Sequence, residues 1–570
     1  SEIDEVLTHV QKIVTLSDGD KRRIVREVRR NRAFVPVTLK ENLSWSEVAR
    51  IEINAPDLPG LMIDVGRSRR YPYGGEAAHV LGYVASVSEK DIDEDPLLKL
   101  PGFRVGRAGI EKVHDMELRG TGGSSEVEVN AFGRMIRELS RREGQPGAEV
   151  MLTLDMGLQQ YIAQRLGNES ASVVVMDVRN GDVLAMVSNP SYDSNDFNRG
   201  LSSAEWQELV NNERAPLINK SIAGVYSPGS TFKMMVLLAA LEKGVISPDQ
   251  KIHCSGEYEL GDAKFHCWKR HGHGFVDAQE AITESCDVYF YEIAKRTGID
   301  RIAATARKFG LDAPSGIDLP GEQGGLIPTR DWKRATRDEP WHQGETVIAG
   351  IGQGFVLMTP LQMALMTARL ANGGRAVVPR LTRAIGGTAQ VPASPSAIPS
   401  LNIPPGHLQL VTEAMDRVVN HATGTARRSA TGIDDFPMAG KTGTVQVRRI
   451  TKLEREQGVR KNEDLPWKYR DHALFVGYAP ADNPRYAISV VVEHGGGGSS
   501  TAAPIARDVL VEAYNRDSAS PGAAIAYKGQ PTGPLSGQPG SEAADAQQQP
   551  DNRPEDRNTR PLLAHTEGDT

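Results

Sequence analysis

The sequence is poor in cysteine, in long apolar runs and in charge of one sign. No run of about 18 consecutive apolar residues occurs, so the sequence has no obvious membrane-spanning helix. Its 66 basic and 73 acidic residues leave a formal net charge of -7, which argues against a nucleic-acid-binding protein and against a polyacidic tail. The three cysteines cannot all pair within the chain, so one thiol is free or the set serves another purpose.

Length and composition predict three segments. A chain of 570 residues exceeds what one hydrophobic core usually supports, so at least two domains are expected. Residues 1–150 mix short strand-like runs with charge-rich helical ones, which predicts an α+β module. Residues 151–516 are expected to form a second domain. Residues 517–570 contain few large apolar residues to offset the entropy of ordering, and we expect them to be disordered.

Hydrophobic patterns at both ends of the second domain predict one antiparallel sheet. The stretch "ASVVVMDVRNGDVLAMVSNPS" alternates around Asn180-Gly181, which predicts a two-residue hairpin. Near the other end, "MAGKTGTVQV", "DHALFVGYAP" and "YAISVVVEHGGGG" read as three strands of a meander. Mostly helical segments separate these two ends. We therefore expect an α+β fold in which the first and last strands of the domain meet in one sheet backed by helices.

A serine and a lysine stand at the start of one apolar run. In "YSPGSTFKMMVLLAALEKG" a Pro-Gly pair predicts a turn, and the residues after Lys233 are apolar on all sides, as in a buried helix. Ser230 then lies at the helix N-terminus, with Lys233 on the same face. A lysine that burial keeps neutral can accept the hydroxyl proton, so the pair predicts an activated serine nucleophile. Alone, the pattern also fits an ordinary helix cap and a solvated lysine.

Two further motifs favour the catalytic interpretation. The stretch "ESCDVYFYEIAKRTG" offers Ser285 and Asp287. The stretch "KTGT", on a predicted strand, offers Lys441, Thr442, Gly443 and Thr444. Ser-x-x-Lys, then Ser-x-Asn or a variant, then Lys-Thr-Gly is the motif order of penicillin-interacting serine acyltransferases.

The sequence also resembles one branch of those enzymes. It contains "GRAGIEKVHDMELRG", "YSPGSTFK", "KRHGHG", "ESCDVYFYEIA", "QGETVIAGIGQGFVLMTPLQMA" and "KTGT" in order. On these motifs, from about Arg70 to Asp517, it resembles the class B penicillin-binding proteins, and the penicillin-binding protein 2 family in particular. The resemblance implies an N-terminal α+β pedestal domain followed by a transpeptidase domain, whose five-stranded antiparallel sheet is flanked by helices. It also implies a peptidoglycan D,D-transpeptidase of the elongation machinery that β-lactams acylate.

The resemblance assigns a role to each motif. Ser230 would attack the penultimate D-Ala carbonyl of a stem peptide and expel the terminal D-Ala, while Lys233 takes the proton. Ser285 would relay a proton to the leaving amine, and Lys441 would help to keep Lys233 neutral. The backbone N-H groups of Ser230 and Thr444 would form the oxyanion hole.

The third motif would also bind substrate. Thr442 and Thr444 would offer hydroxyls to the substrate carboxylate, and a β-carbon at Gly443 would obstruct a substrate strand along this sheet edge. An amine of a neighbouring stem peptide would then accept the acyl group and complete a cross-link. Asp287 stands where the wider superfamily has asparagine, and a carboxylate accepts hydrogen bonds without donating them. The penicillin-binding protein 2 family is similar to this sequence in that exchange.

All three cysteines and four histidines fall close together in the sequence. Cys254, Cys267, Cys286 and His273 could provide a tetrahedral Cys3His zinc site, which is structural because all four positions are protein ligands. The family resemblance favours His273 because "GHG" matches, and His271 is the alternative. A disulfide between two of the cysteines is the competing interpretation. Zinc held by Cys286 would brace the turn that carries Ser285 from behind.

The resemblance further implies a location and partners. A full-length protein of this family is periplasmic and anchored in the inner membrane by an N-terminal helix, which the present sequence lacks. Its expected partners are a SEDS-family glycosyltransferase and the elongation scaffold protein that contacts the pedestal. Three other functions share these motifs: a β-lactamase or a D,D-carboxypeptidase, which pass the acyl group to water, and a non-enzymatic β-lactam sensor.

Overall fold

The computed structural model describes most of the chain up to residue 519. The described residues are 2–14, 16, 18–30, 37–58, 61–63, 68–88, 91, 98, 103–129, 135–391, 397–448, 454 and 457–519. Most of the predicted disordered tail therefore lies outside the described residues. The predicted boundary at residue 516 falls inside the helix α21 (Ala503–Ala519). No helix of the described ranges is both long enough and apolar enough to cross a membrane.

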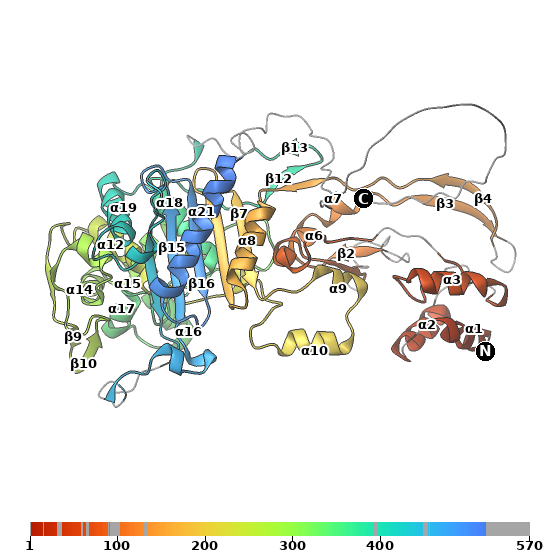
Figure 1. The fold of residues 1–570 in the computed structure, drawn as a ribbon, viewed down its shortest axis with the longest axis horizontal. Helices are drawn as coiled ribbons and strands as arrows, with labels where there is room; N and C mark the ends of the chain where they lie inside the picture. Colours follow the sequence, from red (N-terminus) through yellow and green to blue (C-terminus); the bar gives the residue numbers. More distant parts are fainter. Residues whose placement is uncertain are drawn as a thin grey trace, which may run out of the picture. The chain divides into compact units, whose positions relative to one another are not determined.

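The N-terminal segment, which we call the pedestal, consists of short helices and two-stranded ribbons (Figure 1). Three helices pack around a small apolar core of their own. Two ribbons follow, formed by the pairs β1–β2 and β3–β4. The elements are α1 (Glu2–Ile13), α2 (Asp18–Arg30), α3 (Trp45–Ile53), α4 (Ala78–Leu81), β1 (Val84–Ser86), β2 (Arg104–Gly106), α6 (Gly109–Val113), α7 (Asp115–Arg119), β3 (Ser124–Val129) and β4 (Met135–Arg142).

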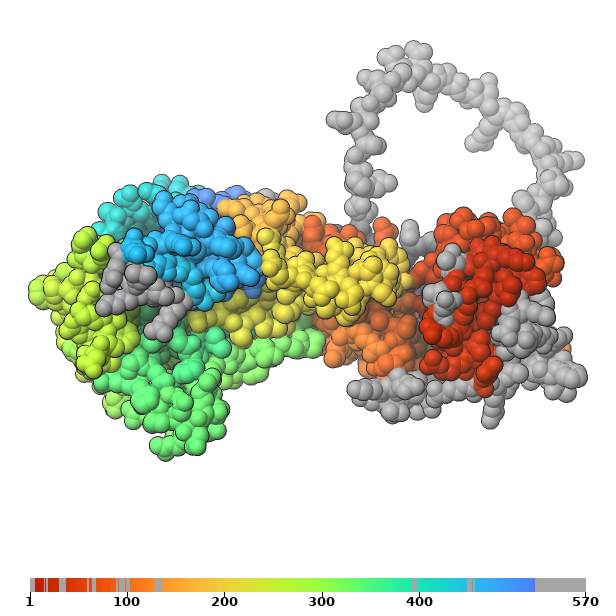
Figure 2. All heavy atoms as spheres, turned by 90° about the horizontal axis from the view of Figure 1, so that it is seen from below, coloured from red at the N-terminus to blue at the C-terminus, as the bar shows by residue number. Residues whose placement is uncertain are grey.

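Part of the pedestal is tied to the second domain by reciprocal polar contacts. The backbone N-H of Tyr71 donates to Asn195 Oδ1 at 2.9 Å, and Asn195 Nδ2 donates back to the Tyr71 carbonyl at 2.8 Å. The rings of Tyr83 and Phe197 stack with centroids 4.1 Å apart. Helix α9 (Ser194–Arg199) contacts β1, and Figure 2 shows yellow residues of this region next to the orange pedestal residues; α10 (Ser203–Asn211) follows α9 along the chain.

A five-stranded antiparallel sheet forms the centre of the second domain. Its strand order is β14-β15-β16-β6-β7. The strands are β6 (Ala171–Asp177), β7 (Val183–Asn189), β14 (Ala439–Val445), β15 (His472–Ala479) and β16 (Tyr486–Val492). Strand β6 pairs directly with β16, in the register Val173 to Val490, so the predicted meeting of the first and last strands is confirmed.

Helices cover both faces of this sheet (Figure 1). Val173 and Val175 of β6 belong to the core that includes α8 (Met156–Leu166) and α21, whereas Val174 and Met176 pack with α18 (Pro360–Ala371) on the opposite face. Burial on both faces explains why β6 reads as a continuous apolar run instead of an alternating pattern. The predicted α+β class with a helix-flanked sheet is confirmed.

The predicted two-residue hairpin at Asn180-Gly181 is wrong in its length. Strands β6 and β7 do form a hairpin, but residues 178–182 separate them. The Gly181 N-H donates to the Asp177 carbonyl at 3.0 Å, which closes a wider turn. A register shift between Val175 and Met176 takes up the extra residues. Gly181 has φ +83°, and a β-carbon there would lie 2.0 Å from the Val378 carbonyl oxygen, so glycine is required.

The segment between the two strand-rich ends is mostly helical, as predicted, with short strands that the patterns did not predict, four of which form two ribbons. These strands form the pairs β8–β11 and β9–β10. They are β8 (Ile252–Cys254), β9 (Glu257–Leu260), β10 (Ala263–His266) and β11 (Gly274–Val276). Besides α9, α10 and α18, the helices of the segment are α11 (Lys220–Ala223), α12 (Lys233–Glu242), α13 (Ala278–Thr283), α14 (Asp287–Thr297), α15 (Ile299–Lys308), α16 (Arg330–Arg337), α17 (Gln343–Ala349) and α19 (Pro405–Asn420). A separate sheet has the order β13-β12-β5, with β5 (Val150–Leu152), β12 (Thr382–Ile385) and β13 (Thr388–Ala389).

Candidate active site and metal cluster

Ser230 lies in a 3-10 turn that leads into the buried helix α12. The turn spans Gly229–Phe232, and α12 begins at Lys233. Ser230 is partly exposed, whereas the Lys233 side chain has no exposed surface. The helix is buried from Lys233 to Leu241, which accounts for its unbroken apolar sequence. This arrangement presents a hydroxyl at the surface and a cation inside the protein on the same helical face.

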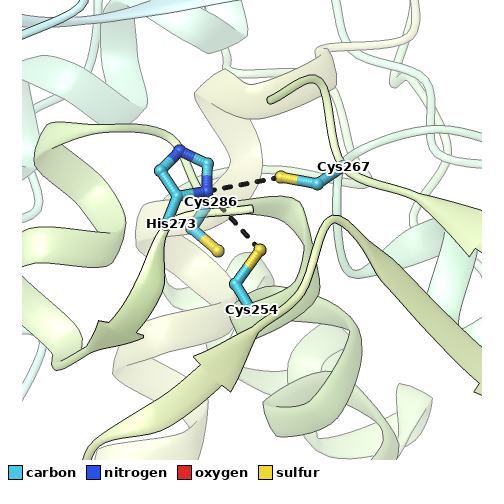
Figure 3. A group of neighbouring side chains, drawn as sticks. All are labelled: Cys254, Cys267, His273 and Cys286. Atoms are coloured by element: carbon cyan, nitrogen blue, oxygen red, sulfur yellow. Dashed lines mark hydrogen bonds between the residues drawn. The ribbon is translucent and has the colours of Figure 1, made fainter. Parts of the chain in front are cut away.

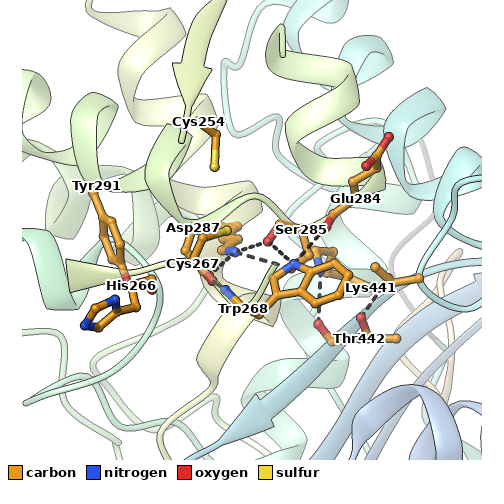
Figure 4. Close-up of polar contacts among 12 residues, drawn as sticks. Cys254, His266, Cys267, Trp268, Glu284, Ser285, Asp287, Tyr291, Lys441 and Thr442 are labelled. Atoms are coloured by element: carbon orange, nitrogen blue, oxygen red, sulfur yellow. Dashed lines mark hydrogen bonds and ion pairs between the residues drawn. The ribbon is translucent and has the colours of Figure 1, made fainter. Parts of the chain in front are cut away.

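Ser285 joins the three sequence motifs. Lys441 Nζ donates to Ser285 Oγ at 2.8 Å, and Lys233 Nζ donates to the same oxygen at 3.2 Å. Lys233 also donates to the Ser285 carbonyl at 3.0 Å. Figure 4 shows Ser285, Asp287 and Lys441 in this network. Residues far apart in the chain therefore converge on one hydroxyl, which is the arrangement that a proton relay needs.

The two lysines have different electrostatic surroundings. Lys233 forms an ion pair with Asp287, with 2.7 Å between Nζ and Oδ1. Lys441 is fully buried, and this burial, aided by the charge of Lys233 and opposed by that of Asp287, holds its pKa well below the usual range. The sequence predicted that Lys441 would help to keep Lys233 neutral. In the structure, Lys441 is the amine that its surroundings drive towards the neutral form.

The backbone at Ser285 is strained. Its φ of +56° is left-handed, a conformation that costs a residue with a β-carbon roughly 1–2 kcal/mol. The turn lies between the end of α13 and the start of α14, and the Cys286 N-H donates to the Ala281 carbonyl at 2.9 Å. The strained turn aims the side chains before and after Cys286 at the two lysines.

Strand β14 carries the third motif at the edge of the sheet. Thr444 is exposed, and its Oγ1 accepts a hydrogen bond from the Gly498 N-H at 3.2 Å. Thr442 is buried, and its hydroxyl lies 2.9 Å from the Thr425 hydroxyl. Lys441 Nζ donates to the Thr442 carbonyl at 3.1 Å. Of the two threonines, only Thr444 therefore presents its side chain to solvent.

Gly443 lies in close contact with the turn that carries Ser230. A β-carbon at Gly443 would lie 3.1 Å from both the Pro228 carbonyl oxygen and Thr231 Cγ2. In the opposite direction, a β-carbon at Gly229 would lie 3.2 Å from the Thr444 carbonyl oxygen. The two glycines therefore let β14 pack directly against the turn that carries Ser230. The expected obstruction of a substrate strand by a β-carbon at this position stays a prediction.

The three cysteines and His273 form one cluster (Figure 3). Their ligand atoms all lie within 4.8 Å of one another. All three cysteines are buried and free, and His273 Nδ1 lies 3.5 Å from the sulfurs of Cys254 and Cys267. His271, the alternative histidine, is exposed and is not part of the cluster. The donor set and its burial fit a closed tetrahedral zinc site.

The chemistry of the thiols also suits a metal. A hydrogen bond from Cys286 lowers the pKa of Cys254 to about 6 and lowers that of Cys267 still further, although burial opposes both shifts. Burial lowers the pKa of His273, but its hydrogen bonds to Cys267 and Cys254 outweigh this effect and raise the pKa. Thiolates are the form of cysteine that binds metals, and the negative charge that they would place in this buried cluster needs a cation.

The ends of strands and of a helix position the cysteines of the cluster, and a backbone hydrogen bond positions His273. Cys254 ends β8, Cys267 directly follows β10, and Cys286 caps α14. The His273 N-H donates to the Cys254 carbonyl at 3.1 Å. A β-carbon at Gly272 would lie 2.1 Å from that same carbonyl oxygen, so glycine is needed beside the histidine.

The sequence analysis did not identify Trp268 and Thr425, whose contacts reach the second and third motifs. Trp268 donates its backbone N-H to Asp287 Oδ2 at 2.9 Å. Thr425 contacts the Thr442 hydroxyl. Trp268 follows Cys267 directly, so its position in a ligand-rich loop was an available signal. Nothing in the sequence around Thr425 points to the third motif.

Family models match both domains. The model described as penicillin binding protein transpeptidase domain matches residues 171–511. The model described as penicillin-binding protein dimerisation domain matches residues 1–152.

Curated and solved proteins are similar over most of the chain. The peptidoglycan D,D-transpeptidase MrdA of Haemophilus influenzae is 38% identical over 517 residues, covering 89% of this chain and 79% of that protein. The structure of Pseudomonas aeruginosa PBP2 in complex with WCK 5153 is 38% identical with a TM-score of 0.67, covering 78% of this chain and 89% of that one. A complex between PBP2 and MreC from Helicobacter pylori is 29% identical with a TM-score of 0.76, covering 90% of this chain and 92% of that one.

Proposed function

This chain belongs to the penicillin-binding proteins, within the penicillin-binding protein 2 family of peptidoglycan D,D-transpeptidases, and on that premise we propose how its residues carry out the reaction. Ser230 Oγ attacks the carbonyl of the penultimate D-Ala of a donor stem peptide. A serine ester forms, the peptide bond to the terminal D-Ala breaks, and that D-Ala leaves with a proton on its amine. An amine of a neighbouring stem then attacks the ester, forms the cross-link and frees Ser230.

The observation that carries this proposal is the convergence of both lysines on Ser285 Oγ, at 2.8 Å and 3.2 Å. Lys233 follows Ser230 on one helical face. It passes its own proton through Ser285 Oγ to the neutral amine of Lys441, and it then takes the proton of the attacking hydroxyl. Ser285 passes a proton from the lysines to the leaving amine. Asp287 holds Lys233 in place through the ion pair at 2.7 Å.

Strand β14 binds the donor peptide at the free edge of the sheet. Thr444 presents the exposed hydroxyl of the motif and directs it at the terminal carboxylate of the donor. Thr442 acts from inside, through its contact with Thr425. The N-H groups of Ser230 and Thr444 form the oxyanion hole, because the close packing at Gly229 and Gly443 brings these two backbones together.

The cluster of Cys254, Cys267, His273 and Cys286 holds a structural zinc ion. The ion would satisfy three buried thiolates with four protein ligands and leave no open position for a substrate. Because Cys286 lies between Ser285 and Asp287, its attachment to the loop of Cys267 and His273 holds the strained Ser285 turn in place. Zinc therefore contributes to the precision of the site without taking part in a chemical step.

The protein acts on the periplasmic side of the inner membrane. This proposal rests on the family and on its substrate, which lies outside the cytoplasm. The resemblance supports a SEDS-family glycosyltransferase as its polymerase partner. The complex of a Helicobacter pylori relative with MreC supports an elongation scaffold protein as a second partner. β-Lactams acylate Ser230 as analogues of the donor.

A cross-linking assay with the polymerase partner tests the proposal. The wild-type protein should produce cross-linked peptidoglycan and release one D-Ala for each cross-link, and Ser230→Ala should produce neither. A stable penicilloyl ester on Ser230, measured by mass spectrometry, supports a transpeptidase. Rapid release of penicilloate would identify a β-lactamase, and release of D-Ala without cross-links would identify a carboxypeptidase. Cross-linking by Ser230→Ala would refute the assignment of the nucleophile.

A further inference from the structure

Trp268 uses both of its N-H groups to hold the second catalytic motif. Its backbone N-H donates to Asp287 Oδ2 at 2.9 Å, while the other oxygen of that carboxylate accepts from Lys233. Its indole Nε1-H lies 3.1 Å from the carbonyl oxygens of both Glu284 and Ser285. Figure 4 shows the indole directed at the Ser285 turn. One residue therefore contacts the motif on both sides of Cys286.

The Ser285 carbonyl oxygen accepts hydrogen bonds from two different side chains. It accepts hydrogen bonds from Lys233 at 3.0 Å and from the Trp268 indole at 3.1 Å. Because Ser285 has left-handed backbone dihedrals, its peptide needs external contacts to stay in this orientation. The indole supplies one of these contacts.

The ring of Trp268 is exposed to solvent, although its indole N-H is hydrogen-bonded to backbone carbonyl oxygens. The residue is 60% exposed, and its ring touches His273 edge-on with centroids 5.5 Å apart. A single exposed aromatic ring is not unusual on a protein surface. This ring, however, is fixed at a defined position by its hydrogen bonds, so its apolar face is a preformed contact surface.

The fixed ring stands beside the path of the donor peptide. The donor carbonyl must reach Ser230, and its terminus must lie along β14. Ser285 lies next to this path because its hydroxyl contacts both Lys233, at the start of α12, and Lys441 of β14. A ring whose nitrogen lies 3.1 Å from the Ser285 carbonyl therefore borders the same space.

We propose that Trp268 is a positioning and specificity-determining residue of the transpeptidase reaction. Its indole N-H keeps the Ser285 peptide in its reactive orientation, and its exposed ring contacts the apolar atoms of the acyl donor. The inference rests on the proposed function and adds a residue to it. Positioning affects the rate of acylation, whereas the ring contact affects the affinity for the donor before reaction.

Two substitutions separate these effects. Trp268→Phe keeps an apolar ring and loses the indole N-H, and Trp268→Ala loses both. With a fluorescent penicillin in stopped-flow experiments, Trp268→Phe should lower the acylation rate constant about tenfold, as expected for a lost hydrogen bond to a strained group. Its dissociation constant should change by no more than about twofold. Trp268→Ala should show the same lower rate constant and a dissociation constant raised by about tenfold or more.

Controls exclude a purely structural effect. Phe275→Ala removes another exposed aromatic ring, 68% exposed on the neighbouring strand β11, and should leave both constants within about twofold of wild type. Rates are expressed per titratable Ser230, and each variant should keep one zinc ion and an unchanged Tm. The inference would be overturned if the loss of acylation rate or donor affinity disappeared once rates are expressed per titratable Ser230. It would also be overturned if these losses paralleled a loss of zinc.

The wild type distinguishes the inference from its premise. If the wild type is acylated at Ser230 and both Trp268 variants match it within about twofold, the inference alone is wrong. If the wild type is not acylated at Ser230, the proposed function fails and the inference fails with it. A slower Trp268→Phe with unchanged affinity, together with weaker donor binding by Trp268→Ala, supports both roles.

Discussion

The Nζ atom of Lys441 lies 2.8 Å from the hydroxyl oxygen of Ser285, although the two residues come from different motifs and different layers of the fold. Lys441 belongs to an edge strand, and Ser285 to a turn between two helices. The contact makes the relay dependent on the relative position of the sheet and the helical segment. The four predictions that follow concern this contact and the elements that maintain it.

Replacing Ser285 by glycine should separate catalysis from stability. Glycine adopts φ +56° without strain, so the free energy of unfolding should change by less than about 1 kcal/mol. The acylation rate should fall by about 10²–10⁴-fold because the proton relay loses its hydroxyl. Urea unfolding and fluorescent-penicillin kinetics measure the two quantities. Full acylation activity in a stably folded Ser285→Gly would exclude the relay.

Lys441 should give stability a distinctive dependence on alkaline pH. Its pKa is lowered in the folded state and is about 10.4 in the unfolded chain. Between these two values the unfolded state binds more protons, so the stability contribution of this group rises with pH. The cost of burying the charged amine is fully present below the folded pKa and is relieved as the pH approaches about 10.4.

Lys441→Met should remove this dependence. Methionine keeps the approximate length of the side chain without a titratable amine. As the pH rises from neutral towards about 10, the wild type should therefore gain unfolding free energy relative to the variant. Comparing the two proteins in parallel cancels the tyrosines that titrate in the same range. A constant difference across this range would show that the folded pKa of Lys441 is not lowered.

Cys286→Ser and His273→Ala should each lose the metal. Elemental analysis of the wild type should find one zinc ion per chain, because four ligands are available. Loss of the ion removes a cross-link within the fold and should lower the Tm and the rate of acylation. His271→Ala is the matched control, since this exposed histidine lies outside the cluster and its loss should change neither metal content nor Tm. A disulfide and no metal in the wild type would refute the zinc site.

Gly443→Ala should slow acylation by separating two backbones. The added carbon would lie 3.1 Å from the Pro228 carbonyl oxygen, so β14 and the Ser230 turn would have to move apart by a few tenths of an ångström. A misplacement of this kind is expected to slow the reaction by about tenfold or more. Gly406→Ala is the control, because its β-carbon would meet no atom within 4 Å. Equal activity of both variants would show that the close packing at Gly443 is not needed.

The sheet could be predicted well because its strands are buried. The sequences of β15 and β16 are almost entirely apolar, and turn residues on either side mark where these strands end. The hairpin at Gly181 was predicted too short, and its turn contacts a segment far away in sequence, where the Arg380 N-H donates to the Gly181 carbonyl at 3.1 Å. Local patterns carry no information about such a contact.

The residues of the site were recognisable from their order, but their contacts were not. Ser230, Ser285 and Lys441 follow from the motifs. The pairing of Asp287 with Lys233 depends on how α14 is oriented, and the burial that lowers the pKa of Lys441 depends on all the surrounding layers. The contact of Trp268 with Ser285 joins the β10–β11 connection to the turn between α13 and α14, and local patterns do not show it.

The pairing of β6 with β16 has a consequence for how the protein folds. Val173 and Val490 are neighbours in the sheet, yet nearly the whole catalytic domain lies between them in the sequence. Loop closure over such a separation is entropically costly and tends to make folding slow. Until β16 has been synthesised, the edge of β6 opposite β7 has no partner strand. During synthesis that edge is a point where aggregation competes with folding, and where a chaperone would be most useful.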